Sequence, residues 1–265
     1  LGCFGLTDPD AGSDPAGMET TAVNRGEHWV LNGTKTWISN ATVANLALVF
    51  AQADPGKGHD GIAAFLVEKG SRGFSTRPIT EKLGLRASDT GELIFEDCTV
   101  PDSALLGQRG QGFKVAMTAL DNGRYSVAAG CVGIIQGCLD ACTEYAKMRK
   151  QFGRRIGSFQ LVQDMIARMA VDLDAARLLV FRAGSLKNQG LPSTVETSIA
   201  KYFASEAAVR AATDAVQIFG GYGYSEEMPV ARYYRDAKVA TIYEGTSQIQ
   251  KLIIGSHLLG MKAFT

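Results

Sequence analysis

Glu244 is a carboxylate that could act as a general base, in the run Ile242-Tyr243-Glu244-Gly245-Thr246-Ser247. A buried carboxylate has a raised pKa and becomes a stronger base than a free one. The same run is also typical of a helix start, where the helix dipole favours an acidic residue and Thr246 and Ser247 supply capping oxygens. On that pattern, the last helix is expected at residues 244–259. The local sequence leaves both interpretations open.

Two polar segments near the N-terminus could contact a ligand. Residues 6–14 are dense in Gly, Pro, Asp, Ser and Thr, which favours an ordered loop that presents backbone N–H groups and hydroxyls. An ordinary turn is the alternative. Residues 32–40 carry Trp37 among Thr and Ser residues. A tryptophan on a strand is more often part of the core than a cofactor contact.

Two later segments carry groups suited to anions or to a close backbone approach. Residues 148–155 are rich in Arg and Lys and lie at an expected helix end. They could bind an anion or form a solvated basic cap. Residues 220–224 read Gly-Gly-Tyr-Gly-Tyr, which is typical of a turn between helices. Glycines alone are a weak signal for a nucleotide site.

The N-terminal part of the chain is predicted to be β-structure. Turn-forming residues separate short runs of strand-forming residues, at 29–31, 34–39, 44–51, 62–67 and 90–100. Asn32-Gly33 lies between two of these runs and predicts a two-residue hairpin turn. Several short strands with turns between them favour a β-barrel or sandwich.

Beyond Gly112 the sequence changes to helical periodicity. Apolar and small residues recur every three or four positions, which predicts helices at residues 113–148, 160–188 and 194–219. Long helices with short connections favour a bundle. We therefore expect an α+β fold, with a β-barrel or sandwich domain at residues 1–106 and a four-helix-bundle-like domain at residues 107–265.

The composition argues against several classes of function. The 27 Lys and Arg residues balance the 27 Asp and Glu residues, so the basic excess typical of nucleic-acid binding is absent. The three histidines are far apart, and the five cysteines lack CxxC spacing, so we expect no metal site and a reducing compartment. No apolar run approaches the roughly 18 residues of a membrane span.

Taken together and in this order, five segments resemble the acyl-CoA dehydrogenase family. They are CFGLTDPDAGSD from Cys3, LNGTKTWISN from Leu31, RKQFGRRIGSFQ from Arg149, DAVQIFGGYGY from Asp214 and RDAKVATIYEGTSQIQ from Arg235. The resemblance extends over all 265 residues, and the last segment is highly specific. With Glu at position 244, the chain resembles the short-chain, medium-chain, short-branched-chain and glutaryl-type members. Other branches of the family carry the base on a different helix.

The resemblance implies FAD as the cofactor. In the first two segments, the residues implied to contact FAD are Phe4, Leu6, Thr7, Gly12, Ser13, Trp37 and Ser39. The residues implied to reach the FAD of a neighbouring subunit are Arg149, Gln151, Phe152, Gln160, Gln217, Gly220 and Gly221. Thr246 and Gln248 match positions that contact FAD just after the base. In this pattern an arginine faces the pyrophosphate, and glycines let the backbone approach.

The reaction implied by the resemblance is α,β-dehydrogenation of an acyl-CoA thioester to the 2-enoyl-CoA. Glu244 would remove the α-proton while a hydride leaves the β-carbon for flavin N5, and hydrogen bonds would stabilise the enolate oxygen. The residues implied to contact the substrate are Ser13, Asp121, Arg124, Tyr243 and Gly245. The resemblance also implies a homotetramer, and an electron-transferring flavoprotein as the partner.

Two alternatives stay open at this point. An acyl-CoA oxidase-like enzyme would let oxygen reach the flavin, and a truncated, non-catalytic fragment would only bind FAD or support oligomerisation. Family members begin with a helical domain of about 100 residues, which we expect to be absent from this chain because the sequence opens on Leu1. The preference for acyl chain length therefore cannot be predicted. We expect a location in the bacterial cytoplasm or the mitochondrial matrix, without insertion into a membrane.

Overall fold

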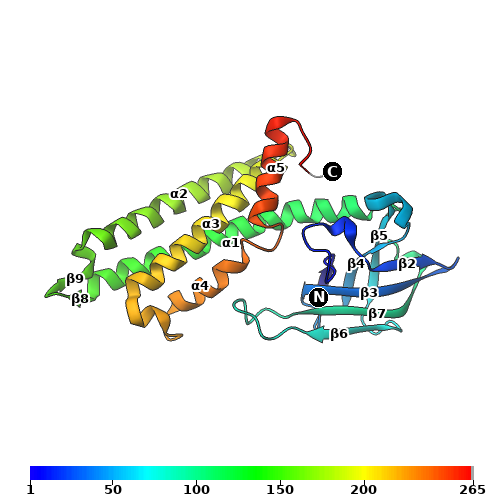
Figure 1. Cartoon of the computed structure of the whole chain (residues 1–265), viewed down its shortest axis with the longest axis horizontal. Coiled ribbons are helices and arrows are strands. Elements are labelled where there is room, and N and C mark those ends of the chain that lie inside the picture. The colour runs from blue at the N-terminus through cyan, green and yellow to red at the C-terminus, as the bar shows by residue number, and fades with distance from the viewer. Residues whose placement is uncertain (264–265) are drawn as a thin grey trace. The chain divides into compact units, whose positions relative to one another are not determined.

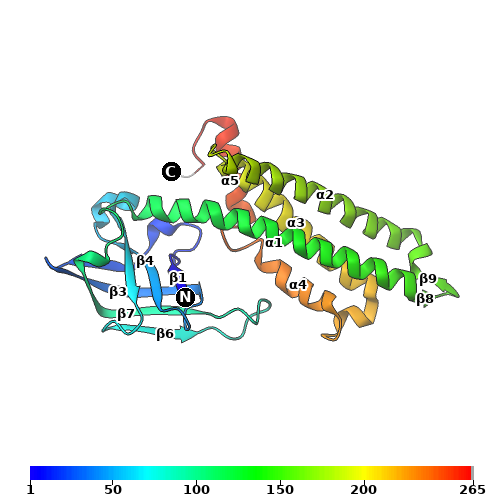
Figure 2. The same cartoon turned by 180° about the vertical axis from the view of Figure 1, so that it is seen from behind.

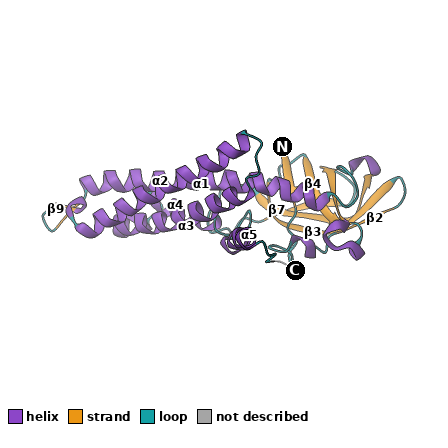
Figure 3. Cartoon of the chain, turned by 90° about the horizontal axis from the view of Figure 1, so that it is seen from above, coloured by secondary structure: helices purple, strands orange, loops and turns teal. Residues whose placement is uncertain are grey.

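The computed structural model describes residues 1–263, and the chain forms two compact units that divide between Ala119 and Leu120. The main sheet lies in the first unit, and the second unit is mostly helical (Figure 3). Helix α1 (Gly112–Met148) begins in the first unit and continues into the second. The expected α+β fold, a β domain followed by a helical domain, is confirmed.

The first unit is built on one curled sheet rather than on two stacked sheets. β3 and β7 form a long antiparallel pair, with β6 beside β7 and β2 beside β3. β4 pairs in parallel with β1 and β2 and antiparallel with β5. The strands are β1 (Gly2–Gly5), β2 (Thr21–Asn24), β3 (His28–Ser39), β4 (Leu46–Gln52), β5 (Ile62–Glu68), β6 (Phe74–Pro78) and β7 (Thr90–Pro101).

The expected hairpin turn at Asn32-Gly33 is wrong. β3 runs from His28 to Ser39 and pairs with β7 on both sides of Gly33. Gly33 has a φ of +139°, and a Cβ there would lie 2.7 Å from the Cα of Thr20. A close approach of the chain before β2 therefore requires this glycine. Because that contact is not local, an Asn-Gly pair alone does not distinguish it from a turn.

A buried ion pair ties the loop of residues 6–14 to β3. The Lys35 ammonium bonds to the Asp8 carboxylate and donates to the carbonyl oxygen of Leu6 at 3.0 Å. Asp8 also accepts from the backbone N–H of Thr20 at 2.7 Å. Burial lowers the pKa of Lys35, and the charge of Asp8 opposes this shift. Both side chains are buried, so removing either would leave an uncompensated buried charge. The ion pair therefore holds the loop of residues 6–14 in place.

The second unit is a helical bundle, in which α1, α2 and α3 run side by side (Figures 1 and 2). The helices that follow α1 are α2 (Gln160–Asn188), α3 (Thr194–Phe219), α4 (Pro229–Val239) and α5 (Ser247–Leu259). Two short strands, β8 (Lys150–Gln151) and β9 (Arg154–Arg155), connect α1 to α2. Short 3₁₀ segments occur at Pro15–Gly17, Pro55–Gly61, Asp102–Ala104, Ile156–Ser158 and Gly220–Tyr224. The bounds of α2 and α3 agree with the expected ranges.

The core of the bundle is rich in small side chains. Seven buried alanines lie along α3, and three buried cysteines line α1. Burial raises the pKa of Cys131, Cys138 and Cys142 to about 12, so these thiols stay protonated. All five cysteines are buried and free. Within residues 1–263, no group of three His, Cys, Asp or Glu residues could hold a metal ion.

By length and composition alone, α1 could cross a membrane. It contains no unbroken apolar run of that length, but its many Ala, Gly and Cys residues give it a high mean hydropathy. The buried residues Ala128, Cys131, Ile135, Cys138 and Cys142 belong to the core of the bundle. A core helix meets the same criterion, but only 28% of the most apolar stretch of α1 is buried within the described residues.

Candidate active site

Glu244 lies in the turn between α4 and α5, so the expected helix start at residue 244 is wrong. α5 begins at Ser247, and Thr246 is its N-cap, with the threonine hydroxyl accepting from the N–H of Ile249 at 3.2 Å. Glu244 has a φ of +55°, and Gly245 has a φ of +83°. A glutamate rarely adopts this left-handed conformation, and it persists only where the surroundings hold it.

Two buried polar side chains hold the Glu244–Gly245 turn. Lys201 on α3 donates from Nζ to the carbonyl oxygen of Gly245 at 2.6 Å. Gln250 on α5 donates from Nε2 to the carbonyl oxygens of Glu244 and Gly245, at 3.1 Å and 3.0 Å. Both side chains are fully buried. The strained backbone is therefore fixed from two different helices.

The Glu244 carboxylate lies against α1 where a glycine leaves room for it. A Cβ at Gly123 would collide with this carboxylate, lying 2.6 Å from its Cδ. Arg124, the next residue, is buried and pairs with Asp121 at 2.7 Å. Oε2 of Glu244 is buried and has no hydrogen-bond partner within the described part of the chain.

Burial shifts the pKa values of Glu244 and Lys201 toward each other. Burial raises the pKa of Glu244, and the charges of Arg124 and Lys201 oppose this shift. Burial lowers the pKa of Lys201 to about 8, while that of Arg124 also falls through burial. A carboxylate with a raised pKa is a stronger base than a free carboxylate.

The structure brings four of the five expected substrate contacts together with Glu244. Tyr243 and Gly245 flank it in the turn, and Asp121 and Arg124 are one α1 turn apart beside it. Asp121 also accepts from the hydroxyl of Thr194 at 2.9 Å. The fifth expected contact, Ser13, is exposed in the first unit, and the expected FAD contact Gln248 is exposed on α5.

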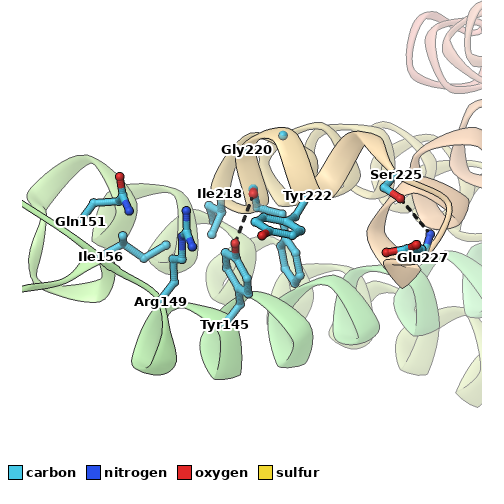
Figure 4. A pocket seen from close by; sticks show the side chains of 11 residues that line it. Tyr145, Arg149, Gln151, Ile156, Ile218, Gly220, Tyr222, Ser225 and Glu227 are labelled. Atoms are coloured by element: carbon cyan, nitrogen blue, oxygen red, sulfur yellow. Dashed lines mark hydrogen bonds between the residues drawn. The ribbon is translucent and has the colours of Figure 1, made fainter.

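A hollow elsewhere in the bundle, which we call the second hollow to distinguish it from the surroundings of Glu244, is lined by four of the seven residues expected to reach a neighbour's FAD. It has a volume of about 580 Å³, and Arg149, Gln151, Gly220 and Gly221 all line it. Figure 4 shows the Arg149 side chain between Ile156 and Tyr145. The other three residues, Phe152, Gln160 and Gln217, are exposed and do not line it.

The second hollow has the donor set and the backbone access that a pyrophosphate needs. The Arg149 guanidinium lies over the ring of Tyr222 at 5.5 Å and supplies a planar cation. Gly220 has a φ of +60° at the end of α3, and added Cβ atoms at Gly220 or Gly221 would meet nothing within 4 Å. The glycine pair therefore ends a helix and also leaves backbone open to a ligand.

In the first unit, Trp37 is exposed rather than part of the core. It has a φ of +60° and an exposed fraction of 63%, at an irregularity where β3 shifts its register against β7. The core tryptophan is instead Trp29, which is 1% exposed. The neighbouring N–H of Thr36 donates to the carbonyl oxygen of Thr7 at 2.9 Å, so the loop of residues 6–14 lies beside this bulge.

The other expected FAD contacts of the first unit differ in exposure. Gly12, Ser13 and Ser39 are exposed, Phe4 and Thr7 are half-buried, and Leu6 is buried with its carbonyl oxygen bonded to Lys35. An exposed indole beside exposed hydroxyls offers a flat surface with hydrogen-bonding groups at its edge. This arrangement suits a planar, polar ring system.

Comparison with known families matches both units of the chain. Residues 3–98 match the middle domain of acyl-CoA dehydrogenases, and residues 110–259 match the C-terminal domain of acyl-CoA dehydrogenases. The chain belongs to the acyl-CoA dehydrogenase family. This is a family of flavoprotein oxidoreductases.

Individual acyl-CoA dehydrogenases are similar over almost the whole chain. The mitochondrial short-chain specific acyl-CoA dehydrogenase of Mus musculus is 48% identical over 98% of this chain and 63% of its own length. A glutaryl-CoA dehydrogenase of Desulfococcus multivorans is 47% identical over 99% of this chain and 68% of its own. The solved butyryl-CoA dehydrogenase of Megasphaera elsdenii has a TM-score of 0.95 and 47% identity, over 98% and 68% of the two chains. This chain thus spans about two thirds of their length.

Three residues beside Glu244 carry no role in the sequence-based assignment. Lys201 and Gln250 hold the turn, and Gly123 makes room for the carboxylate. One signal for Lys201 was available, because it occupies a position at core spacing within the alanine-rich face of α3. The contacts of Gly123 and Gln250 join segments that are distant in sequence, so spacing alone gave no signal for them.

Proposed function

We propose that this chain carries the base and part of the cofactor site of an acyl-CoA dehydrogenase that oxidises short-chain acyl-CoA thioesters. One observation carries the proposal: Glu244 is half-buried, burial raises its pKa, and its buried Oε2 has no hydrogen-bond partner within the described residues. A carbon acid as weak as a thioester α-position needs such a base. Similarity to a short-chain enzyme favours a short acyl chain, and similarity to a glutaryl-CoA dehydrogenase makes glutaryl-CoA the second candidate.

The residues around Glu244 have different roles in proton removal. The Glu244 carboxylate accepts the α-proton, and Gly123 leaves room for this carboxylate beside α1. In the described part of the chain, the backbone N–H of Glu244 donates no hydrogen bond. It is therefore available to donate to the thioester carbonyl oxygen as enolate charge develops. The Arg124–Asp121 pair keeps a cation beside the base without leaving it unpaired.

FAD fits the donor sets of both units. Trp37, Thr7 and Ser39 would hold the flavin ring, and Arg149 with the Gly220–Gly221 turn would hold a pyrophosphate. When bound, FAD supplies the two-electron acceptor for the hydrogen that leaves the β-carbon. We infer that the second hollow serves the FAD of a neighbouring subunit, which requires at least a dimer and agrees with a homotetramer.

The electron acceptor and the compartment belong to the same proposal. An electron-transferring flavoprotein reoxidises the flavin, in a mitochondrial matrix or a bacterial cytoplasm. The mitochondrial name of the mouse relative and the bacterial source of the other two support these two compartments. An oxidase-like enzyme, which passes electrons to oxygen, is the alternative, and hydrogen peroxide formed in step with the enoyl product would identify it.

A panel of acyl-CoA thioesters tests the proposed activity. The full-length protein, loaded with FAD under anaerobic conditions, should lose its flavin absorbance on addition of butyryl-CoA and form the 2-enoyl product. We expect a smaller bleaching rate with octanoyl-CoA, because the proposed substrate is short. Faster bleaching with glutaryl-CoA than with butyryl-CoA would move the assignment to the second candidate. A protein that binds FAD but is bleached by no member of the panel would contradict the proposal.

Replacement of Arg149 by Ala tests the second hollow. We expect the dissociation constant for FAD to rise roughly tenfold or more, because a charge-assisted hydrogen bond to phosphate is worth about 1.5–3 kcal/mol. Fluorescence titration of the apoprotein with FAD measures this constant. Arg182→Ala is the matched control, since Arg182 is an α2 arginine that pairs with Glu196. Equal affinity in the Arg149 and Arg182 variants would exclude Arg149 from the FAD site.

A further inference from the structure

Lys201 is a fully buried cation whose charge the proposed reaction does not yet use. We propose that Lys201 is a positioning residue for Glu244, which holds the left-handed turn through the Gly245 carbonyl and keeps the carboxylate ionised through its charge. This inference rests on the proposed function, because it assigns a role toward the proposed base. It follows from the contacts of the turn and from the charges that surround it.

The contacts of Lys201 link the core of α3 to the Glu244 turn. Its only direct partner in the described part of the chain is the Gly245 carbonyl oxygen, 2.6 Å from Nζ. Gln250 donates to the same oxygen at 3.0 Å and also to that of Glu244. Two donors on the carbonyls of a strained pair set the direction in which the Glu244 side chain leaves the backbone. Lys201 therefore determines the position of the carboxylate without touching a reacting atom.

The hydrogen bond alone does not account for a lysine at this position. A buried ammonium costs much more free energy than a neutral donor unless another group offsets its charge. The α3 residues around Lys201 are buried and uncharged, including Thr197, Ser198, Ala204 and Ser205. Its counter-charge must therefore come from outside α3 or from Glu206.

The charged groups that face Lys201 leave Glu244 as its main counter-charge. From α1 these groups are Arg124, a cation paired with Asp121, and Cys131, whose thiol pKa is raised to about 12. From α3, Glu206 influences Lys201 more weakly than Glu244 does and accepts from the hydroxyl of Ser247 at 2.5 Å. Tyr243, in the turn, has a raised pKa and stays neutral.

The coupling works in both directions between Lys201 and Glu244. Burial is the largest cause of both pKa shifts, lowering the pKa of Lys201 to about 8 and raising that of Glu244. Each charge opposes the shift of the other, so an ammonium at 201 favours the ionised carboxylate at 244. Without this charge, the pKa of Glu244 would rise further, and less of the base would be in the ionised form that accepts the α-proton.

Three variants of the FAD-loaded full-length protein separate the charge of Lys201 from its hydrogen bond. Lys201→Met removes both, Lys201→Arg keeps the charge, and Gln250→Leu weakens the same turn without changing charge. Lys147→Met is the control, because Lys147 is an exposed lysine that pairs with Glu144 on α1. The first readout is the ¹³C NMR titration of the Glu244 carboxyl, assigned by its loss in Glu244→Gln. The second is the pH dependence of kcat and KM with butyryl-CoA.

The expected results differ among the variants. In Lys201→Met the Glu244 titration and the acid limb of kcat/KM both move to higher pH. At pH 7 its kcat falls about tenfold or more, while KM changes much less, because the base is affected more than binding. Lys201→Arg returns the titration toward that of the unchanged protein. Gln250→Leu lowers kcat without moving the titration, and Lys147→Met changes neither.

An unchanged Glu244 titration in Lys201→Met would overturn the proposal. If Lys201→Met does not fold, Lys201→Arg tests the proposal instead. A Glu244 titration that stays in place in Lys201→Arg, while Gln250→Leu alters only kcat, supports the role of the charge. An equal movement of the titration in Lys201→Arg and Gln250→Leu would refute it. Activity retained in Glu244→Gln would instead refute the proposed base, and the NMR titration would still report on Lys201.

Discussion

Replacing Glu244 with Gln should lower the rate of flavin bleaching by butyryl-CoA by roughly a hundredfold to ten-thousandfold, the range of general base catalysis. The amide has the shape of the carboxylate but cannot accept the α-proton. FAD should remain bound, because Glu244 belongs neither to the second hollow nor to the register irregularity of β3 at Trp37. Stopped-flow absorbance measures bleaching, and the ratio of flavin to protein absorbance measures FAD content. Glu196→Gln is a matched control, because Glu196 is a carboxylate on α3 that pairs with Arg182.

From pH 5 to pH 8, the stability of the Glu244→Gln variant should rise relative to that of the unchanged protein, on top of a constant cost from removing a counter-charge of Lys201. Burial raises the pKa of Glu244 in the folded state above its value in the unfolded chain. Its contribution to stability is therefore complete below the unfolded pKa and is lost as pH rises through the folded pKa. The neutral amide does not undergo this loss. Urea unfolding at pH 5 and pH 8 should show this relative rise, whereas a relative fall from pH 5 to pH 8 would contradict the raised pKa.

The sequence predicted the helices well because their periodicity is set within each helix. The bounds of α2 and α3 followed from apolar spacing and from the turn residues between them. The prediction of a hairpin at Asn32-Gly33 was wrong for the opposite reason. Gly33 is needed because the chain at Thr20, a residue before β2, approaches it closely. Trp37 and Trp29 could not be told apart by strand propensity, because the register irregularity that exposes Trp37 depends on pairing with β7.

The candidate site was predictable where a motif is continuous and not where contacts join distant segments. Asp121, Arg124 and Glu244 followed from the family resemblance, and the structure places them together. The roles of Lys201, Gln250 and Gly123 could not be predicted, because each depends on packing against the turn at residues 244–245. The core spacing of Lys201 on α3 indicates that it is buried, but the spacing does not indicate its contact with the turn.

Gly123→Ala should reduce butyryl-CoA oxidation by roughly a hundredfold, because a displacement of about 1 Å can cost that much. The new methyl group would collide with the Glu244 carboxylate, lying 2.6 Å from Cδ and 2.9 Å from Oε1. The carboxylate is the far end of a flexible side chain, so it should move while α1 keeps its place. We therefore expect an unchanged FAD content and melting temperature, with the loss confined to kcat. Circular dichroism melting and steady-state kinetics measure these quantities.

Gly130→Ala is the matched control on the same helix. Gly130 is exposed, and a Cβ there would meet nothing within 4 Å. Alanine should therefore stabilise α1 by about 0.5–1 kcal/mol without changing activity. Full activity in Gly123→Ala, or an equal loss in both variants, would contradict a role for Gly123 in making room for the base. The expected opposite results would mean that a helix interior carries a destabilising glycine at position 123 because the catalytic carboxylate needs that space.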